Sequence, residues 1–354
     1  MARTIITTVG ISLLSNAQRE GLTEDGEILD FLRRKPAEAS AEINSLEGLP
    51  LRPGEDEVRL LVSNTPEGQR VAQLLEGYLK ERGVSCSHKT IEGLGYEARG
   101  FVDYGLKSFV HALAQEVSVA RKRGREVLIN ATGGFKAEIA YATVVGLVFK
   151  VPVYYMHERF KEIVYLPPTP LNWDDALIAW HWDFFQWLME GEGETRPKAE
   201  VESRLKALPT EVGMLLEESK LDSGVVVGFS PLGQAYIEAF RLKREEVQQI
   251  PILLSPKAYR EWSDMDPSSR EKFKRVLENL RLPNRRLNSE LKSGGGDALA
   301  YPTGHVDERV FYAERDGKLY VFALTRHGPE YDRLCKEGFR WEDHEPETFV
   351  PWEG

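Results

Sequence analysis

Asn130-Ala131-Thr132-Gly133-Gly134-Phe135-Lys136 joins an apolar, strand-like run at 127–129 to a helix-like run at 136–148. Two glycines in such a turn let backbone N–H groups approach an anion, and the helix N-terminus adds a favourable dipole. Thr132 and Lys136 add a hydroxyl and a positive charge. The stretch predicts a site for a phosphate-bearing small molecule. It lacks the Gly-x4-Gly-Lys-Ser/Thr order of a P-loop, and an ordinary strand-to-helix turn remains the alternative.

The first 171 residues alternate between strand-like and helix-like segments. Strands are expected at 4–9, 58–63, 85–91, 126–130 and 153–156, and helices at 67–82, 101–123 and 136–148. This alternation predicts a Rossmann-like, doubly wound parallel sheet of the α/β class, whose ligands bind beyond the carboxyl ends of the strands. The insert at 20–57 is expected to form two short helices. Pro167-Pro168-Thr169-Pro170 ends this domain, which we place at 1–171.

The bulk composition narrows the function classes. The chain has 354 residues, 42% of them apolar and 29% charged, which predicts a globular protein of two or three domains. A net charge of −10 argues against general nucleic-acid binding, duplex DNA included. No apolar run is long enough to predict a membrane helix, and Met1-Ala2-Arg3 leads into a strand. Cys86 and Cys335 lack metal spacing, which favours a cytoplasmic location.

Residues 172–248 differ in character. An aromatic helix containing Trp182, Phe184 and Phe185 is expected to pack against the protein or a second copy. Helices at 199–207 and 211–219, a β-like run at 224–229 and a helix at 234–242 follow, which is the order of a winged helix-turn-helix. Its expected DNA-reading surface is acidic, so a connector role is favoured; the glutamates are Glu200, Glu202, Glu211, Glu217 and Glu218.

Residues 249–354 are expected to form an α+β unit. A strand at 252–254 precedes Ser255-Pro256, a helix start, and Asp266-Pro267 divides the following helical run into a pair. Three strands are expected at 298–301, 309–314 and 319–325, with Asp316-Gly317 as a hairpin turn. Between residues 255 and 340, 17 Lys and Arg stand against 14 Asp and Glu, whereas the tail after Arg340 is acidic. The chain's basic surface is therefore expected here.

Two motifs in the first domain resemble a known family. The stretch 8–16, Thr-Val-Gly-Ile-Ser-Leu-Leu-Ser-Asn, together with the glycine turn, resembles the CARF sensors of type III CRISPR systems, which bind cyclic oligoadenylates. The resemblance implies a homodimer with one ring across its axis, and cyclic tetra-adenylate is the preferred ring. The implied ligand residues are Gly10, Ile11, Ser12, Asn16, Thr132, Gly133, Gly134, Phe135 and Lys136, and 95–99 would form part of a covering loop.

Some CARF relatives also cleave the ring that they bind. This chemistry needs a 2′-hydroxyl in line with its neighbouring phosphate and groups that stabilise charge on that phosphate. Ser12 and Lys136 match the family positions that provide these groups. Slow, self-limiting ring cleavage is therefore a hypothesis, and the alternative is that both residues only bind phosphate.

The third unit resembles the RelE family of messenger-RNA interferases, toxins that cut messenger RNA in the ribosomal A site. The resemblance lies in a helix pair, three strands with Arg309 early in the second, and then Thr325-Arg326-His327 and Tyr331. It departs from the best-known pattern, since 297–301 contains no lysine. It implies a ribosome-dependent, metal-independent endoribonuclease with no cofactor.

The residues themselves support this chemistry. Metal-free RNA cleavage needs a base, cations for the phosphorane and an acid for the leaving oxygen. Arg309 and Arg326 are expected on neighbouring strands as a phosphate clamp, with His327 or His305 as base or acid. Tyr331 would donate a proton or stack on a base. Lys292, Arg285 and Arg286 would guide the RNA. Surface ion pairing of Arg309 with Glu308 or Glu314 is the alternative.

Two rival functions remain open. Glu290-Leu291-Lys292 is a Glu-x-Lys triplet, as found in metal-dependent restriction-type nucleases, but no Asp stands on a suitable preceding strand. A transcription regulator would use only the sensor and the winged helix. The favoured prediction is a homodimeric effector with a sensor (1–171), a winged-helix connector (172–248) and a RelE-like ribonuclease (249–354). It would be activated by cyclic oligoadenylate and act on the ribosome and its A-site mRNA in antiviral defence.

Overall fold

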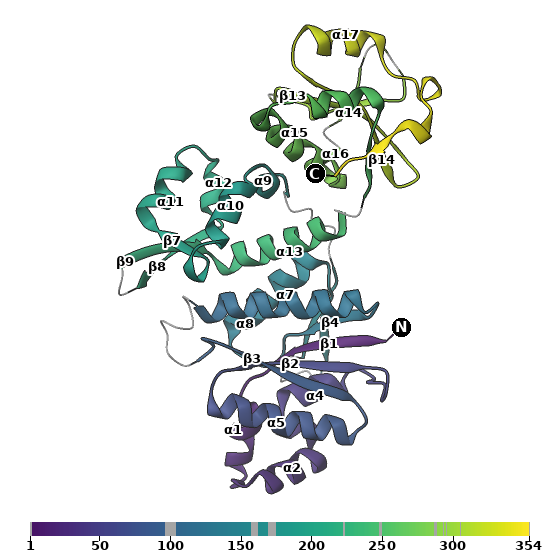
Figure 1. The fold of residues 1–354 in the computed structure, drawn as a ribbon. Helices are drawn as coiled ribbons and strands as arrows, with labels where there is room; N and C mark the ends of the chain where they lie inside the picture. The colour runs from purple at the N-terminus through teal and green to yellow at the C-terminus, as the bar shows by residue number, and fades with distance from the viewer. Residues whose placement is uncertain are drawn as a thin grey trace. The chain divides into compact units, whose positions relative to one another are not determined.

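The computed structural model describes residues 2–95, 104–156, 162–168, 175–221, 224–247, 250–286, 289–292, 294, 296–304 and 306–353. The chain divides into two compact units, Met1–Phe240 and Arg241–Gly354. Each unit has its own sheet and core (Figure 1). The expected division into three domains stays a prediction. None of the helices in the described part of the chain combines the length and apolar character that a membrane crossing needs.

The first unit contains a six-stranded sheet in the order β3-β2-β1-β4-β5-β6. All five expected strands are present, and they pair in parallel: β1 (Arg3–Thr8), β2 (Glu57–Ser63), β3 (Ser85–Ile91), β4 (Glu126–Asn130) and β5 (Val153–Met156). The antiparallel edge strand β6 (Ile163–Leu166) was not expected. The chain runs outward from β1 to β3 and then returns to β4. The strand order therefore reverses between β1 and β4, which is where doubly wound sheets bind ligands.

Helices cover both faces of this sheet (Figure 1). On one face lie α7 (Leu106–Lys122) and α8 (Lys136–Phe149). On the other lie α1 (Ser12–Arg19), α2 (Asp25–Arg34), α4 (Ala41–Glu47) and α5 (Pro66–Glu81). The insert forms three helices rather than two, because α3 (Pro36–Ala39) begins at a proline and Ser40 caps a separate α4. Residues 101–103 of the expected helix 101–123 lie outside the described residues.

The rest of the first unit combines helices with a small antiparallel sheet, ordered β7-β9-β8. The aromatic segment forms α9 (Asp175–Trp180) and α10 (Trp182–Met189), and Phe185 stacks on Phe229 with ring centroids 6.2 Å apart. Then follow η2 (Glu192–Glu194), β7 (Thr195–Pro197), α11 (Lys198–Leu205), α12 (Thr210–Gly213), β8 (Leu216–Leu221), β9 (Gly224–Phe229) and α13 (Pro231–Val247). The helix expected at 211–219 is therefore wrong beyond Gly213, because residues 216–221 pair with β9. The winged-helix assignment stays a prediction.

The second unit contains a six-stranded sheet in the order β11-β12-β13-β14-β10-β15. Its strands are β10 (Ile252–Leu254), β11 (Glu290–Leu291), β12 (Leu299–Tyr301), β13 (Glu308–Arg315), β14 (Lys318–Arg326) and β15 (Val350–Pro351). The sheet is mixed rather than wholly antiparallel, since β10 pairs in parallel with β14. The acidic tail folds as well: η3 (Trp341–Asp343) and η4 (Pro346–Thr348) lead to β15 on β10.

Both faces of this second sheet are covered. The expected helix pair, α14 (Pro256–Ser263) and α15 (Pro267–Leu280), lies on one face, where Phe273 packs with Val310 and Leu324. The short α16 (Pro283–Arg286) follows, and α17 (Pro329–Glu337) lies on the other face, where Tyr331 packs with Phe311. The predicted starts are confirmed, since Ser255 Oγ accepts from Ala258 N–H at 3.1 Å and Asp266 Oδ1 from Ser269 N–H at 3.0 Å.

Candidate functional site

The two predicted ligand motifs meet at the point where the strand order reverses. Gly10 follows β1 and Gly134 follows β4, and these strands are neighbours. The two backbones are so close that a Cβ on Gly10 would lie 2.8 Å from Gly134 N. Gly134 has a φ of +91°, which other residues rarely adopt. The structure therefore brings the Gly10–Ser12 and Thr132–Lys136 segments together, each leading into a helix N-terminus.

A glutamate that the sequence analysis missed lies beneath this junction. Glu42, on α4, is fully buried. Its Oε1 accepts the Gly10 N–H at 2.8 Å, and its Oε2 accepts the Ser12 and Ser40 hydroxyls at 3.0 and 2.7 Å. A Cβ on Gly133 would lie 2.1 Å from Glu42 Oε1, so the carboxylate also requires glycine there. Glu42 thus joins three chain segments under the predicted pocket.

Two predicted ligand residues use their polar groups inside the protein. The Thr132 hydroxyl donates to Asn130 Oδ1 at 2.7 Å and accepts from Met156 N–H at 3.1 Å, so it joins the ends of β4 and β5. The Asn16 Nδ2 donates to the carbonyls of Glu38 and Ala39 at 3.0 and 3.2 Å and fixes the end of α3. Both residues support the site without a hydrogen left for a ligand.

The start of α8 provides the positive end of the site. Lys136 is its first residue and is exposed, and the described residues offer its ammonium group no carboxylate partner. Phe135 is 37% exposed, and its N–H donates to Glu138 Oε1 at 3.3 Å. Burial raises the pKa of the Glu138 carboxyl to about 7. The carboxyl therefore stays protonated to a higher pH than an exposed glutamate, which reduces its repulsion of an anion.

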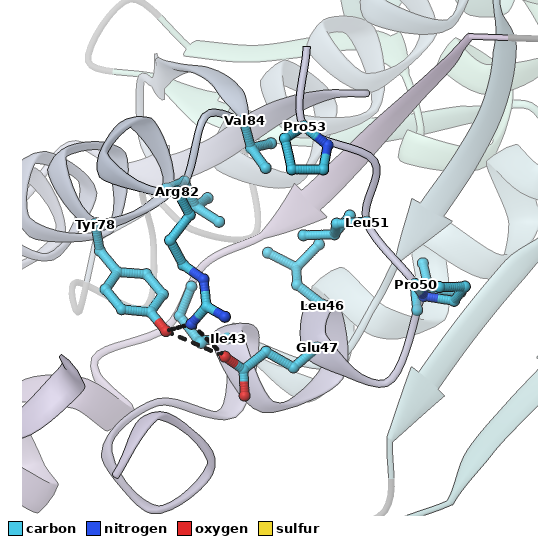
Figure 2. A pocket seen from close by; sticks show the side chains of 11 residues that line it. Ile43, Leu46, Glu47, Pro50, Leu51, Pro53, Tyr78, Arg82 and Val84 are labelled. Atoms are coloured by element: carbon cyan, nitrogen blue, oxygen red, sulfur yellow. Dashed lines mark hydrogen bonds and ion pairs between the residues drawn. The ribbon is translucent and has the colours of Figure 1, made fainter. Parts of the chain in front are cut away.

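A separate pocket of about 410 Å³ lies elsewhere in the first unit (Figure 2). It is near the amino ends of β2 and β3, where Leu51, Pro53 and Val84 form much of its apolar wall. The Arg82 guanidinium at its edge is already hydrogen bonded to Glu47 Oε1, at 2.9 Å, and to the Tyr78 hydroxyl. An apolar wall and a neutralised arginine do not fit a polyanionic ring, so this pocket is not our candidate.

In the second unit, three of the predicted nuclease residues gather around the phenol ring of a fourth, Tyr331. The Tyr331 ring centroid lies 5.4 Å from Lys292 Nζ, 5.6 Å from the Arg309 guanidinium carbon and 4.9 Å from the His327 ring centroid. His327 is exposed and Lys292 is half-buried, whereas Tyr331 is 5% exposed. Burial lowers the pKa of Lys292, but its hydrogen bonds to Glu290 and Tyr331 outweigh that effect and raise it, so the ammonium stays charged.

Arg309 differs from the expected phosphate contact. It is 3% exposed, and its guanidinium donates to the carbonyls of Gly304, at 2.6 Å, Glu308, at 3.3 Å, and Val306. These bonds fix the loop before β13. In the described structure, these backbone carbonyls hold Arg309 in place of the expected ion pair with Glu308 or Glu314. Arg309 therefore positions the loop and the Tyr331 ring.

The expected clamp of Arg309 and Arg326 is wrong. Arg309 pairs across the hairpin with Thr325, and Arg326 pairs with Glu308, so the two arginines point to opposite faces of the sheet. The cause is a β-bulge at Phe311/Tyr312, which shifts the register by one residue. Arg326 instead donates to Ser269 Oγ at 2.6 Å, on the α15 face.

The two predicted RNA-guiding arginines serve the fold instead. Arg285 is 2% exposed. Arg286 donates to the carbonyls of Leu280 and Arg281 at 3.1 and 2.9 Å, near the end of α15, and forms an ion pair with Glu314 at 3.0 Å. Neither is placed to hold an RNA backbone. His305, the other predicted acid or base, lies outside the described residues.

The residues of the metal-dependent alternative were also located. Glu290 is hydrogen bonded to its own triplet partner, Lys292. Within the described ranges, no three His, Cys, Asp or Glu side chains are grouped so that they could hold a metal ion. The metal-dependent nuclease therefore stays a prediction, because the described part of the chain shows no set of three side chains that could hold its metal.

Part of the chain matches a known protein family. Residues 37–169 match the family described as CRISPR-associated protein (Cas_APE2256), a range that contains Glu42, β2 to β5 and the glycine turn. Among solved structures, protein VC1899 from Vibrio cholerae shares 11% identity, with a TM-score of 0.29 over 90% of this chain and 79% of that chain. Over residues 37–169, this chain is similar to a CRISPR-associated family.

Two further solved structures are similar at the same low level. Can2 from Sulfobacillus thermosulfidooxidans, in complex with cyclic tetra-adenylate, shares 11% identity, with a TM-score of 0.29 over 92% of this chain and 78% of that chain. Enterococcus italicus Csm6, bound to cyclic hexa-2′-fluoro-hexa-dAMP, shares 13% identity, with a TM-score of 0.25 over 79% and 54%.

Proposed function

We propose that this chain is a ligand-activated ribonuclease of type III CRISPR defence, in which cyclic oligoadenylate binds at the carboxyl ends of β1 and β4. One observation carries the proposal: the Gly10 turn meets the Gly134 turn beside Lys136, and the Gly134 turn and Lys136 belong to the segment 37–169 that matches a CRISPR-associated family. In a homodimer, two such sites would face one ring. Cyclic tetra-adenylate is the preferred ring.

The chemistry of the site suits a ring of phosphodiesters. Lys136 supplies a mobile charge, and the first turns of α1 and α8 supply backbone N–H groups and positive dipole ends. The buried Glu42 carboxylate opposes an anion, but three donors already neutralise much of its charge. The balance favours a ligand whose phosphates contact Lys136 while its other polar groups reach the Gly10–Ser12 turn.

The nuclease proposal rests on the cluster around Tyr331. Lys292 would stabilise negative charge on the phosphorane, and His327 would transfer a proton at the exposed edge of the cluster. The Tyr331 hydroxyl, hydrogen bonded by Lys292, would donate to the leaving oxygen. Arg309 would hold this arrangement in place. The RelE-like proposal is also supported by the element order, since the helix pair α14 and α15 precedes the strands β12 to β14.

Activation requires that the ring prefer the active state. Moving a two-state population from 1:99 to 99:1 needs a preference of about 10⁴-fold, or roughly 5.5 kcal/mol. The ring would supply it by drawing together the turns of two subunits, with residues 172–248 as the connector. Slow ring cleavage by Ser12 and Lys136 would then end the signal, and an intact ring after long incubation with the dimer would exclude it.

The test uses translating ribosomes with a defined messenger RNA. The full chain is added with and without cyclic oligoadenylates, and the cuts are mapped by primer extension. The proposal expects ring-dependent cuts within the ribosomal A site. Binding to duplex DNA without RNA cleavage would instead favour the transcription regulator.

A further inference from the structure

The Ser12 hydroxyl has a fixed set of hydrogen bonds. It donates to Glu42 Oε2 at 3.0 Å and accepts from the Ala41 N–H at 3.2 Å. A serine hydroxyl has one hydrogen and two lone pairs. Its hydrogen and one lone pair are therefore used inside the protein. One lone pair remains on a half-buried side chain at the end of the first-strand turn.

Glu42 can only accept the hydrogen of the Ser12 hydroxyl. A backbone N–H can only donate, so the bond from Gly10 requires an acceptor at Oε1. The Ser40 hydroxyl accepts from Ile43 N–H at 3.3 Å as the cap of α4, and its own hydrogen goes to Glu42 Oε2 at 2.7 Å. An ionised carboxylate has only acceptor sites. The Ser12 hydroxyl therefore donates to Glu42 Oε2, as Gly10 and Ser40 donate to the same carboxyl group.

We infer that Glu42 is a positioning residue that makes Ser12 an acceptor for a hydroxyl group of the ligand, so that this turn recognises ribose and not phosphate. The inference rests on the proposed function and names the part of the ring nucleotide that reaches Ser12. A phosphate oxygen has no hydrogen to offer Ser12, and it would be repelled by Glu42. A ribose 2′-hydroxyl can donate there, while Lys136 contacts the phosphates. The site would then select rings of RNA over rings of DNA.

The test compares two probes, cyclic tetra-adenylate and its all-2′-deoxy analogue, by calorimetric titration of the full chain. In a homodimer two Ser12 residues face one ring, so the wild-type protein should bind the ribose ring about 10²-fold more tightly, at about ten-fold for each hydrogen bond to a half-buried acceptor. Ser12→Ala removes the acceptor, so the ratio of the affinities for the ribose and deoxyribose rings should fall to about one.

Glu42→Gln is the sharper variant, because it keeps the side-chain volume while it replaces one acceptor oxygen by an NH₂ donor and removes the negative charge. The Gly10 N–H forces the amide oxygen into the Oε1 position. The amide NH₂ group then faces Ser12 and donates to it, which releases the Ser12 hydrogen toward the ligand. The ribose preference should disappear although the pocket keeps its shape. Ser40→Ala is the matched control, since it removes another hydroxyl from Glu42 and leaves the Ser12–Glu42 bond in place.

The outcomes separate the inference from the proposed function. Loss of the ribose preference in Ser12→Ala and Glu42→Gln, with the preference kept in Ser40→Ala, supports the inference. A wild-type protein that binds both rings equally, or a Ser12→Ala protein with an unchanged ratio, overturns it and leaves the proposed function standing. If the wild-type protein binds neither ring, the proposed function fails and the inference fails with it.

Discussion

The Arg309 guanidinium carbon lies 5.6 Å from the centre of the Tyr331 ring, and both side chains are almost completely buried. A buried arginine is stable only when its hydrogens find acceptors and its charge finds a compensating group. Here three backbone carbonyls and the face of a phenol ring provide both. The pair connects the loop before β13 with the first turn of α17. Stability and catalysis in the second unit are therefore expected to depend on the same two residues.

Replacing Arg309 by lysine should destabilise the second unit. Lysine keeps the charge but loses the planar fork, so buried carbonyls of the 304–308 loop lose their donors. We expect the free energy of unfolding to fall by about 2–4 kcal/mol, measured by urea unfolding. Arg326→Lys is the matched control: its side chain is 52% exposed, and the change should stay within about 1 kcal/mol. Equal effects of the two substitutions would contradict the burial argument.

Tyr331→Phe tests the proposed proton donor with little change in packing. Only the hydroxyl is removed, and the ring remains in its contacts with Phe311 and Arg309. The rate of ring-activated RNA cleavage should fall about 10²–10³-fold, as when one stabilising donor is lost. Arg326→Ala, on the opposite face, should change the rate less than ten-fold. The reverse order of effects would place the active site on the α15 face instead.

The first unit should lose stability as pH rises through neutrality. Burial raises the pKa of Glu138 to about 7, compared with 4.5 when exposed, so the folded state binds the proton more tightly. Its contribution is complete below pH 4.5 and is lost as pH rises through 7, in total about 3 kcal/mol. Urea unfolding at pH 5, 6, 7 and 8 measures it. Glu138→Gln should flatten this dependence, and an unchanged slope in that variant would exclude Glu138 as its source.

Replacing Gly133 tests the packing of the glycine turn, and replacing Gly77 in α5 is the control. Gly133→Ala would place a methyl group 2.1 Å from Glu42 Oε1 and 2.8 Å from Thr8 O, so the turn must shift. The melting temperature and the affinity for the ring should both fall. Gly77→Ala, inside α5, meets nothing within 4 Å and should stabilise the protein by about 0.5–1 kcal/mol. A neutral Gly133→Ala would show that Glu42 is not held against this turn.

The local signals in the sequence were sufficient for most elements. Asp316-Gly317 predicted a two-residue hairpin turn, and both residues have positive φ, with Arg315 opposite Lys318. The glycine turn after β4 and the caps at Ser255 and Asp266 were likewise determined by neighbouring residues. The alternation of strands and helices was enough to predict that β1 to β5 pair in parallel.

The misses have tertiary causes. Glu42 is far in sequence from Gly10 and Gly133, and only the packing of α4 brings its carboxylate beneath them. The sequence did contain one signal: Glu42 is spaced so that it shares a helix face with Ser45 and Leu46, and both of these residues are buried. The faces of Arg309 and Arg326 depend on one bulge: a regular hairpin from the Asp316-Gly317 turn would place both arginines on the same face. No local residue pattern marks that bulge.

The most direct test of the account is a calorimetric titration of the full chain with cyclic tetra-adenylate, repeated with Lys136→Ala and with Lys80→Ala. Lys80 is another exposed lysine, near the end of α5, and serves as the control. We expect saturable binding of one ring per two chains, weakened at least ten-fold by Lys136→Ala and unchanged by Lys80→Ala. Absence of binding heat for cyclic oligoadenylates of any ring size, in a folded protein, would contradict the account.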